Sequence, residues 1–90
     1  MNNDRRKQIE ALKERADDLR SQLESLKDDT QSVLDEEQEY YDNMPESLQG
    51  GEKGEKAQAA IDALGEVTSA LDDIDSALGD VAGNFDTAAE

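Results

Sequence analysis

Carboxylates are the side chains of this sequence that offer most chemistry, because 24 of its 90 residues are aspartate or glutamate. Carboxylate metal sites in helical bundles usually add histidine through a Glu-x-x-His spacing, and the sequence has no histidine. The cluster of Asp72, Asp73 and Asp75 lacks the glycine and the terminal glutamate of a calcium loop. We therefore predict an exposed acidic face there, with no bound metal and no cofactor.

Nucleophilic catalysis would require a serine, threonine or lysine beside a base, and the sequence has neither histidine nor cysteine to act as that base. The stretch Gly50-Gly51-Glu52-Lys53-Gly54 follows no strand and does not have the spacing of a phosphate-binding loop. A chain this short also has little core in which to build a concave pocket. These features predict a binding protein with no catalytic residues.

The charge of the chain is large and unevenly distributed. The net charge is −15, and residues 28–52 hold nine acidic and no basic side chains, whereas residues 1–27 hold seven basic and six acidic ones. Such a field repels nucleic acid and anionic membranes and favours basic partners. We expect no direct contact with nucleic acid or membrane, and a basic host protein as a possible partner.

Two tyrosines fall inside this acidic run. Tyr40 lies on the apolar seam and is expected in the core, whereas Tyr41 lies beside the seam and is expected to be half exposed. Tyrosine provides contact area at low entropic cost, so acids and a tyrosine together predict a surface for a basic groove. The candidate partner-binding residues are Asp35, Glu36, Glu39, Tyr41, Asp42 and Glu46.

Heptad spacing predicts the elements that carry these side chains. One seam, with spacings of three and four, runs Ile9, Leu12, Ala16, Leu19, Leu23, Leu26, Thr30, Val33, with Tyr40 and Met44 beyond Glu37. A second seam runs Ala57, Ala60, Leu64, Val67, Leu71, Ile74, Leu78, Val81, Phe85, Ala88. Both patterns are typical of amphipathic helices, and Thr30 and Glu37 are expected to set register.

The two seams are joined by the one evident break in the sequence, which holds the only proline, Pro45, and three of the six glycines. Pro45 disfavours helical geometry at Met44 and suits the start of a short turn, which Gly50 and Gly51 then end. We predict a single domain over residues 1–90, with helices at about 4–43 and 54–84 and a turn at about 44–53. Three helical glycines predict fraying, with a frayed tail at about 85–90.

Together these elements predict an all-α, antiparallel helix-loop-helix (coiled-coil) hairpin. So short a chain gains stability by self-association, and a dimer forming a four-helix bundle is expected. The self-association seam comprises Leu19, Leu23, Leu26, Val33, Leu64, Val67, Leu71, Ile74 and Leu78.

Positions beside the seams add detail. Lys13, Arg20 and Lys27 share one heptad position, and Asp75 is a possible partner across the hairpin. Ala63, Ala70 and Ala77 repeat every seven residues in the second helix and would let another backbone approach closely, or simply reflect the helix propensity of alanine.

The expected compartment follows from what the sequence lacks. The chain has no cysteine, its N-terminal residues are charged rather than apolar, and it has no stretch long enough to span a membrane. We expect a protein of the cytoplasm, which is reducing.

The stretch from Asp35 to Ala57, which includes Tyr40-Tyr41-Asp42-Asn43-Met44-Pro45, resembles small acidic helical hypothetical proteins of bacteriophages and prophages. The resemblance implies a bacterial host, and size and charge are similar to those of phage DNA-mimic and anti-defence proteins. The leading hypothesis is an interaction module that blocks a basic, nucleic-acid-binding host protein. The alternatives are a structural assembly protein whose main partner is itself, and a binder of a small ligand between subunits.

Overall fold

In the computed structural model, which describes residues 2–90, the chain is all-helical and forms a helical hairpin. The elements are α1 (Asn3–Asp42), α2 (Glu46–Gln49) and α3 (Glu52–Ala88). The chain divides into two compact units, one of residues 1–25 and 71–90 and the other of residues 26–70. We call them the terminal unit and the turn unit.

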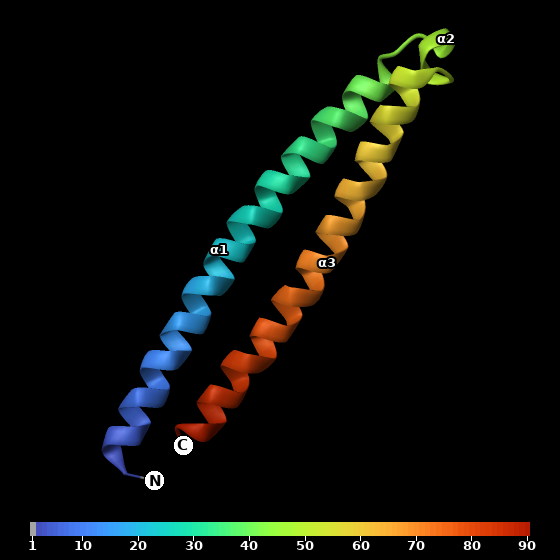
Figure 1. Cartoon of the computed structure of the whole chain (residues 1–90). Helices are drawn as coiled ribbons and strands as arrows, with labels where there is room; N and C mark the ends of the chain where they lie inside the picture. The colour runs from blue at the N-terminus through green and yellow to red at the C-terminus, as the bar shows by residue number, and fades with distance from the viewer. Residues whose placement is uncertain (1) are drawn as a thin grey trace. The chain divides into compact units, whose positions relative to one another are not determined.

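In the terminal unit the first part of α1 packs antiparallel to the last part of α3 (Figure 1). α1 begins at Asn3 because the Asn2 side chain caps it, accepting a hydrogen bond of 2.8 Å from the backbone N–H of Arg5. Lys13 bonds to Asp86 across the pair, and Arg20 bonds to Asp75. These bonds fix the register of the two helices in this unit.

The end of α3 differs from the prediction, because the helix continues to Ala88 where we expected a frayed tail from residue 85. Phe85 is half-buried, and its carbonyl accepts a 3.0 Å hydrogen bond from the N–H of Ala89. The Arg6 guanidinium donates to the carbonyl of Glu90 at 3.0 Å. These contacts outweigh the cost of Gly79 and Gly83 in the helix.

In the turn unit the last part of α1, the short α2 and the first part of α3 follow one another (Figure 1). Pro45 precedes α2 with φ −58° and ψ 146°, as expected of a residue that cannot continue a helix, and Gly50 follows its last residue. The side chain of Gln49 donates to the carbonyl of Tyr41 at 2.9 Å, which ties α2 to the end of α1.

Gly54 explains why the turn needs glycine where α3 begins. A Cβ at this position would overlap the backbone carbonyl of Gln49, so any other residue would force the backbone apart. Gly54 is buried, and Ala57 one turn later is buried as well. The turn is therefore a packed structure in which α2 rests directly on α3.

The helix pair uses only part of each seam. If Ile9 is taken as heptad position a and Leu12 as position d, the residues of α1 that are buried or half-buried fall mostly at a and e. On α1 they include Ile9, Lys13, Ala16, Leu23, Lys27, Thr30, Leu34 and Tyr41, and on α3 they include Ala57, Ile61, Leu64, Thr68, Leu71, Asp75, Leu78, Ala82 and Phe85. At position d, the other half of each seam, Ala60 is half-buried and the large apolar side chains are 39–55% exposed.

Candidate self-association surface

Position d carries large apolar side chains that stay exposed in both units. Leu19 is 55% exposed, Val33 51% and Ile74 48%. In the terminal unit these side chains are Leu12, Leu19, Ile74 and Val81, and in the turn unit they are Leu26, Val33, Tyr40 and Val67. We call these eight residues the open stripe. Exposed apolar residues that recur at one heptad position mark an interaction surface.

Within each unit, α1 and α3 present this stripe on the same side of the pair. Position d is rotated from the a/e contact in one direction around the helix axis, and position b in the other. In an antiparallel pair, a two-fold axis perpendicular to the plane of the helices exchanges equivalent positions and keeps them on one side of that plane. One side of each unit is therefore apolar, and the opposite side holds the b residues.

The b side is polar, and in the terminal unit ion pairs at its border with the helix contact close it: Lys13 and Arg20, at position e, pair with Asp86 at position b and Asp75 at position e. Lys13 Nζ lies 2.6 Å from Asp86 Oδ1, and Arg20 Nε lies 3.1 Å from Asp75 Oδ1. The hydrogen bond to Asp86 raises the pKa of Lys13, and the hydrogen bond to Asp75 raises the pKa of Arg20. The Arg20–Asp75 contact confirms the pairing expected from the sequence.

Gly79 adjoins the Arg20 side chain on this side. A Cβ built at Gly79 would lie 3.3 Å from Arg20 Nη2, so the glycine leaves space for the guanidinium against α3. This side is completed within the chain, whereas the open stripe is not.

Small and charged residues flank the open stripe. On α3 the exposed residues Ala63, Ala70 and Ala77 fall at position g, next to Val67 and Ile74. On α1 the g residues are Gln8, Arg15, Gln22, Asp29 and Glu36, all exposed. A shallow hollow of about 230 Å³, lined by Arg15, Asp18, Leu19 and Gln22, lies against the stripe on α1. The small alanines on α3 would let the backbone of another helix approach closely. The charged residues on α1 would favour a partner that carries opposite charges at the facing positions.

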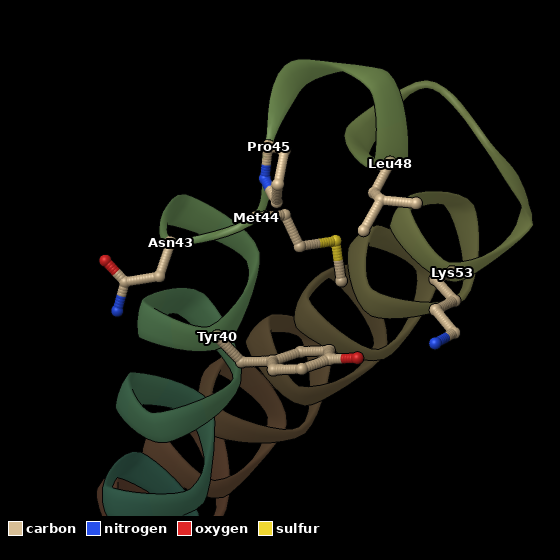
Figure 2. A pocket seen from close by; sticks show the side chains of 6 residues that line it. All are labelled: Tyr40, Asn43, Met44, Pro45, Leu48 and Lys53. Carbon is tan, nitrogen blue, oxygen red and sulfur yellow. The ribbon is translucent and has the colours of Figure 1, made fainter.

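The turn unit also holds a pocket of about 320 Å³ (Figure 2). Figure 2 shows the Met44 side chain extending toward the ring of Tyr40, with Leu48 and Lys53 across the opening. The remaining lining residues are Asn43 and Pro45. The prediction that Tyr40 belongs to the core is wrong, because it is 53% exposed and the helix contact uses position e, where Tyr41 is half-buried.

The structure places the predicted seam residues in three classes. Leu23 and Leu71 are buried between the helices, Leu64 and Leu78 are half-buried, and the remaining five, Leu19, Leu26, Val33, Val67 and Ile74, are exposed. The seam is therefore split between a contact made within the chain and the open stripe.

The predicted partner-binding residues all lie in the turn unit, where Asp35, Glu36, Glu39, Asp42 and Glu46 are exposed and Tyr41 is half-buried. None of the pocket residues Met44, Pro45, Leu48 and Lys53 was among the predicted partner-binding residues, although the sequence placed Met44 and Leu48 beside the tyrosines of the same acidic stretch. An apolar pair around a proline inside an acidic run is the signal that could have identified them. No role was predicted for Arg15 from the sequence, although its heptad position places it beside Leu19.

No family model, curated protein or solved structure matches this chain. Among residues 2–90, no three potential ligands gather closely enough to hold a metal ion. Of the helices in that same range, none combines the length and the apolar character needed to cross a membrane.

Proposed function

We propose that this protein is a non-catalytic assembly module whose first partner is a second copy of itself, with which it forms a four-helix bundle. The open stripe carries the proposal, because large apolar side chains repeat at position d in both units. In four-helix bundles each helix packs against two neighbours through adjoining parts of one seam. Here the a and e positions serve the neighbour within the chain, and position d is available for a helix of the second copy.

The small core supports the same conclusion. In the part of the chain that the structure describes, only Ala16, Leu23, Ala57 and Leu71 are buried apolar residues. Full burial of a leucine, valine or isoleucine side chain contributes roughly 1.5–3 kcal/mol of stability. The side chains of the open stripe are about half exposed in the single chain, so each gains only about half of that free energy there. Covering the stripe would add several kcal/mol per chain, which is comparable to the whole stability of a small domain.

Sedimentation equilibrium over a wide concentration range tests this function. We expect a mass of twice the chain's 9.9 kDa at high concentration, with dissociation on dilution. Leu19→Asp should give the monomer at concentrations where the parent chain is dimeric, and Ser21→Asp, at an exposed position away from the stripe, should not. A parent chain that is monomeric throughout would overturn the proposal.

A second candidate function is favoured by the turn pocket. It opens between Tyr40 and Leu48, both exposed, beside the run of residues 28–52 that holds nine acidic and no basic side chains, and Lys53 is the one charged residue of its lining. We propose that an apolar side chain from a basic segment of a nucleic-acid-binding protein enters this pocket, in the cytoplasm of a bacterial host. Carboxylates around the pocket would steer the segment, and the apolar lining would hold its anchor.

A lysine-rich peptide with one leucine, and the same peptide with serine in its place, separate these two contributions. We expect the leucine peptide to bind more tightly, and binding to weaken with salt. Reversing Glu39, Asp42 and Glu46 to lysine should abolish binding, whereas reversing Glu10, Glu14 and Asp17 should have a much smaller effect. Equal binding of both peptides would exclude the pocket, and equal effects of both charge reversals would exclude the acidic run as the site.

A further inference from the structure

The two helices of the terminal unit differ in charge. Residues 1–25, which include the first part of α1, hold six basic and six acidic side chains, whereas residues 71–90, which include the last part of α3, hold six acidic and no basic ones. Like charges that face each other across an interface disfavour that pairing. The α3 part of this unit is therefore better matched to the α1 part of a second copy than to another α3.

We propose that the terminal units of two copies pack through their open stripes with α1 of each copy against α3 of the other. The inference rests on the proposed self-association and specifies which helices meet. A two-fold axis that lies between the two units and runs parallel to their helices gives this arrangement. The interface is isologous, so every contact that α1 makes with α3 of the second copy occurs twice.

The alternative two-fold axis lies in the same interface but runs perpendicular to the helices, and it places α1 against α1 and α3 against α3. When terminal units meet in that way, two α3 segments come together, each with six acidic and no basic side chains. The axis parallel to the helices avoids this repulsion, because each acidic segment then packs on a segment in which the two signs balance.

The ion pairs within the chain set the heights at which residues of the two copies would meet. Lys13 pairs with Asp86 and Arg20 pairs with Asp75, so the stretch of α1 between the two basic residues lies level with the stretch of α3 between the two acidic ones. Rotation about an axis parallel to the helices leaves every residue at its own height. The same stretches therefore face each other between the two copies.

These heights interleave the apolar residues of the stripe. Leu19 precedes Arg20 by one residue and would lie between Ile74 and Val81 of the second copy, and Leu12, one heptad earlier, would lie beyond Val81. Apolar side chains that alternate in height fill the spaces between those of the facing helix. Side chains that are about half exposed in the single chain would thus become covered on both helices.

Charged and polar residues at the outer border of the stripe are complementary in this arrangement. Arg15, at position g of α1, and Asp80, at position c of α3, lie on the same outer edge of the interface, and their heights differ by less than about one helical turn of 5.4 Å. Gln22 would come close in height to Asp73. All four residues are exposed, and within residues 2–90 no ion pair involves Arg15 or Asp80.

Side-chain size is complementary as well. The hollow of about 230 Å³ on α1 is lined by Arg15, Asp18, Leu19 and Gln22. Ala77 of the second copy would lie at the height of Leu19, and its small side chain would let α3 approach the hollow closely. The Arg15 guanidinium could then extend past Ala77 toward Asp80. In the arrangement with α1 against α1, the long g residues of the two copies would instead face one another.

Charge reversal with matched controls tests the contact at the border. Arg15→Glu should raise the dissociation constant of the dimer about tenfold more than Lys7→Glu, which makes the same change of charge at an exposed f position, because two equivalent pairs become repulsive. Asp80→Arg should differ from Glu14→Arg, another f-position reversal, by about the same factor. The double variant Arg15→Glu/Asp80→Arg should return the constant to within about threefold of the parent value. A double variant no tighter than the single ones, in a chain that still dimerises, would overturn the arrangement.

Disulfide formation between chains tests which helices meet, and the sequence has no cysteine of its own to compete. Under oxidation, Leu19→Cys mixed with Ile74→Cys or with Val81→Cys should give covalent dimers of the two variants, which intact-mass measurement identifies. Ser21→Cys, at an exposed position away from the stripe, is the control and should not couple to Val81→Cys.

The partners that Leu19→Cys selects separate this arrangement from the others. Preferential coupling to Leu12→Cys or to Val33→Cys would show that α1 packs on α1, and would overturn the arrangement while leaving the proposed self-association standing. Failure to couple to Ile74→Cys or Val81→Cys in a sample that is dimeric would overturn it in the same way. A parent chain that is monomeric throughout would overturn both the proposed function and this arrangement.

Discussion

The two sides of the helix pair differ in whether the chain itself completes their contacts. On the b side of the terminal unit, Lys13 and Arg20 reach across to Asp86 and Asp75, so the charges of α1 are matched by charges of α3. On the d side, apolar residues of the same helices, such as Leu19 and Ile74, stay about half exposed. The charged side chains find partners within the terminal unit, whereas these apolar side chains remain about half exposed.

This difference separates the energetic roles of the two sides. Exposed ion pairs contribute little to stability, because solvent screens them and ordering the side chains costs entropy. Buried apolar area contributes far more. The b side therefore sets register with little effect on stability, whereas covering the d side, as proposed, would contribute most of the stability of the assembly.

The largest loss of stability is expected from substitutions at position a, which is buried between α1 and α3. Leu23→Asp or Leu71→Asp places a carboxylate at a buried position between the helices, and should cost about 3–5 kcal/mol of unfolding free energy. Circular dichroism during urea titration measures it. Ser25→Asp, at an exposed position, is the control, and equal losses for all three variants would show that the assigned heptad phase is wrong.

A smaller effect is expected on the open stripe. Ile74→Asp should weaken self-association by about 2–3 kcal/mol, since it removes apolar burial only in the dimer and introduces a charge there. The melting temperature of a dimer rises with protein concentration, so the variant should need a higher protein concentration to reach the melting temperature of the parent chain. Ser76→Asp, at the outer face of α3, should leave the melting curves unaltered, and a stripe variant indistinguishable from it would contradict the claim that this side is covered.

The turn that joins the helices provides a matched pair of glycine substitutions. Gly54→Ala should destabilise the chain by about 1–3 kcal/mol, because its Cβ would overlap the backbone of Gln49. A Cβ at Gly65 would meet no atom within 4 Å, so Gly65→Ala should stabilise the chain by about 1 kcal/mol through the higher helix propensity of alanine. Thermal unfolding measures both, and shifts of the same sign would contradict the packing described for the turn.

The smallest effect is expected on the b side. Asp86 raises the pKa of Lys13 above its ordinary 10.5, so the ion pair stabilises the folded state below that pH and the contribution is lost as pH rises through the raised value. The unfolding midpoint of the parent chain should therefore fall more than that of Lys13→Met as the pH rises above 10.5. Parallel curves for the two proteins would show that the pair contributes nothing.

Local features of the sequence predicted much of the fold. Pro45 and the glycines after it located the turn, and spacings of three and four located both long helices. The shared heptad position of Lys13, Arg20 and Lys27 predicted Asp75 as a possible partner of that row, and the structure pairs Asp75 with Arg20. These predictions succeeded because backbone geometry and helical periodicity act over a few residues.

Two features depended on contacts between distant segments. The apolar stripe of each long helix is wider than one helix contact, so the sequence does not show which of its edges packs on the other helix of the chain. Charged residues at position e also hid the contact that the helices make through positions a and e. Lys13 and Lys27 are half-buried there, which their charge does not indicate, because a lysine can pack its alkyl chain against a helix and keep its ammonium in solvent. The end of α3 is likewise held by Arg6, 84 residues away from Glu90 in sequence.

The most direct test of the account detects contacts between the open stripes of two chains. In an equal mixture of methyl-labelled and unlabelled protein, isotope-filtered nuclear Overhauser measurements report only contacts between chains. We predict strong intermolecular contacts for the methyl groups of Leu19, Leu26 and Val33, which are exposed in the single chain. The absence of any intermolecular contact at these methyl groups, in a sample concentrated enough for association, would contradict the claim that a second copy covers the stripe.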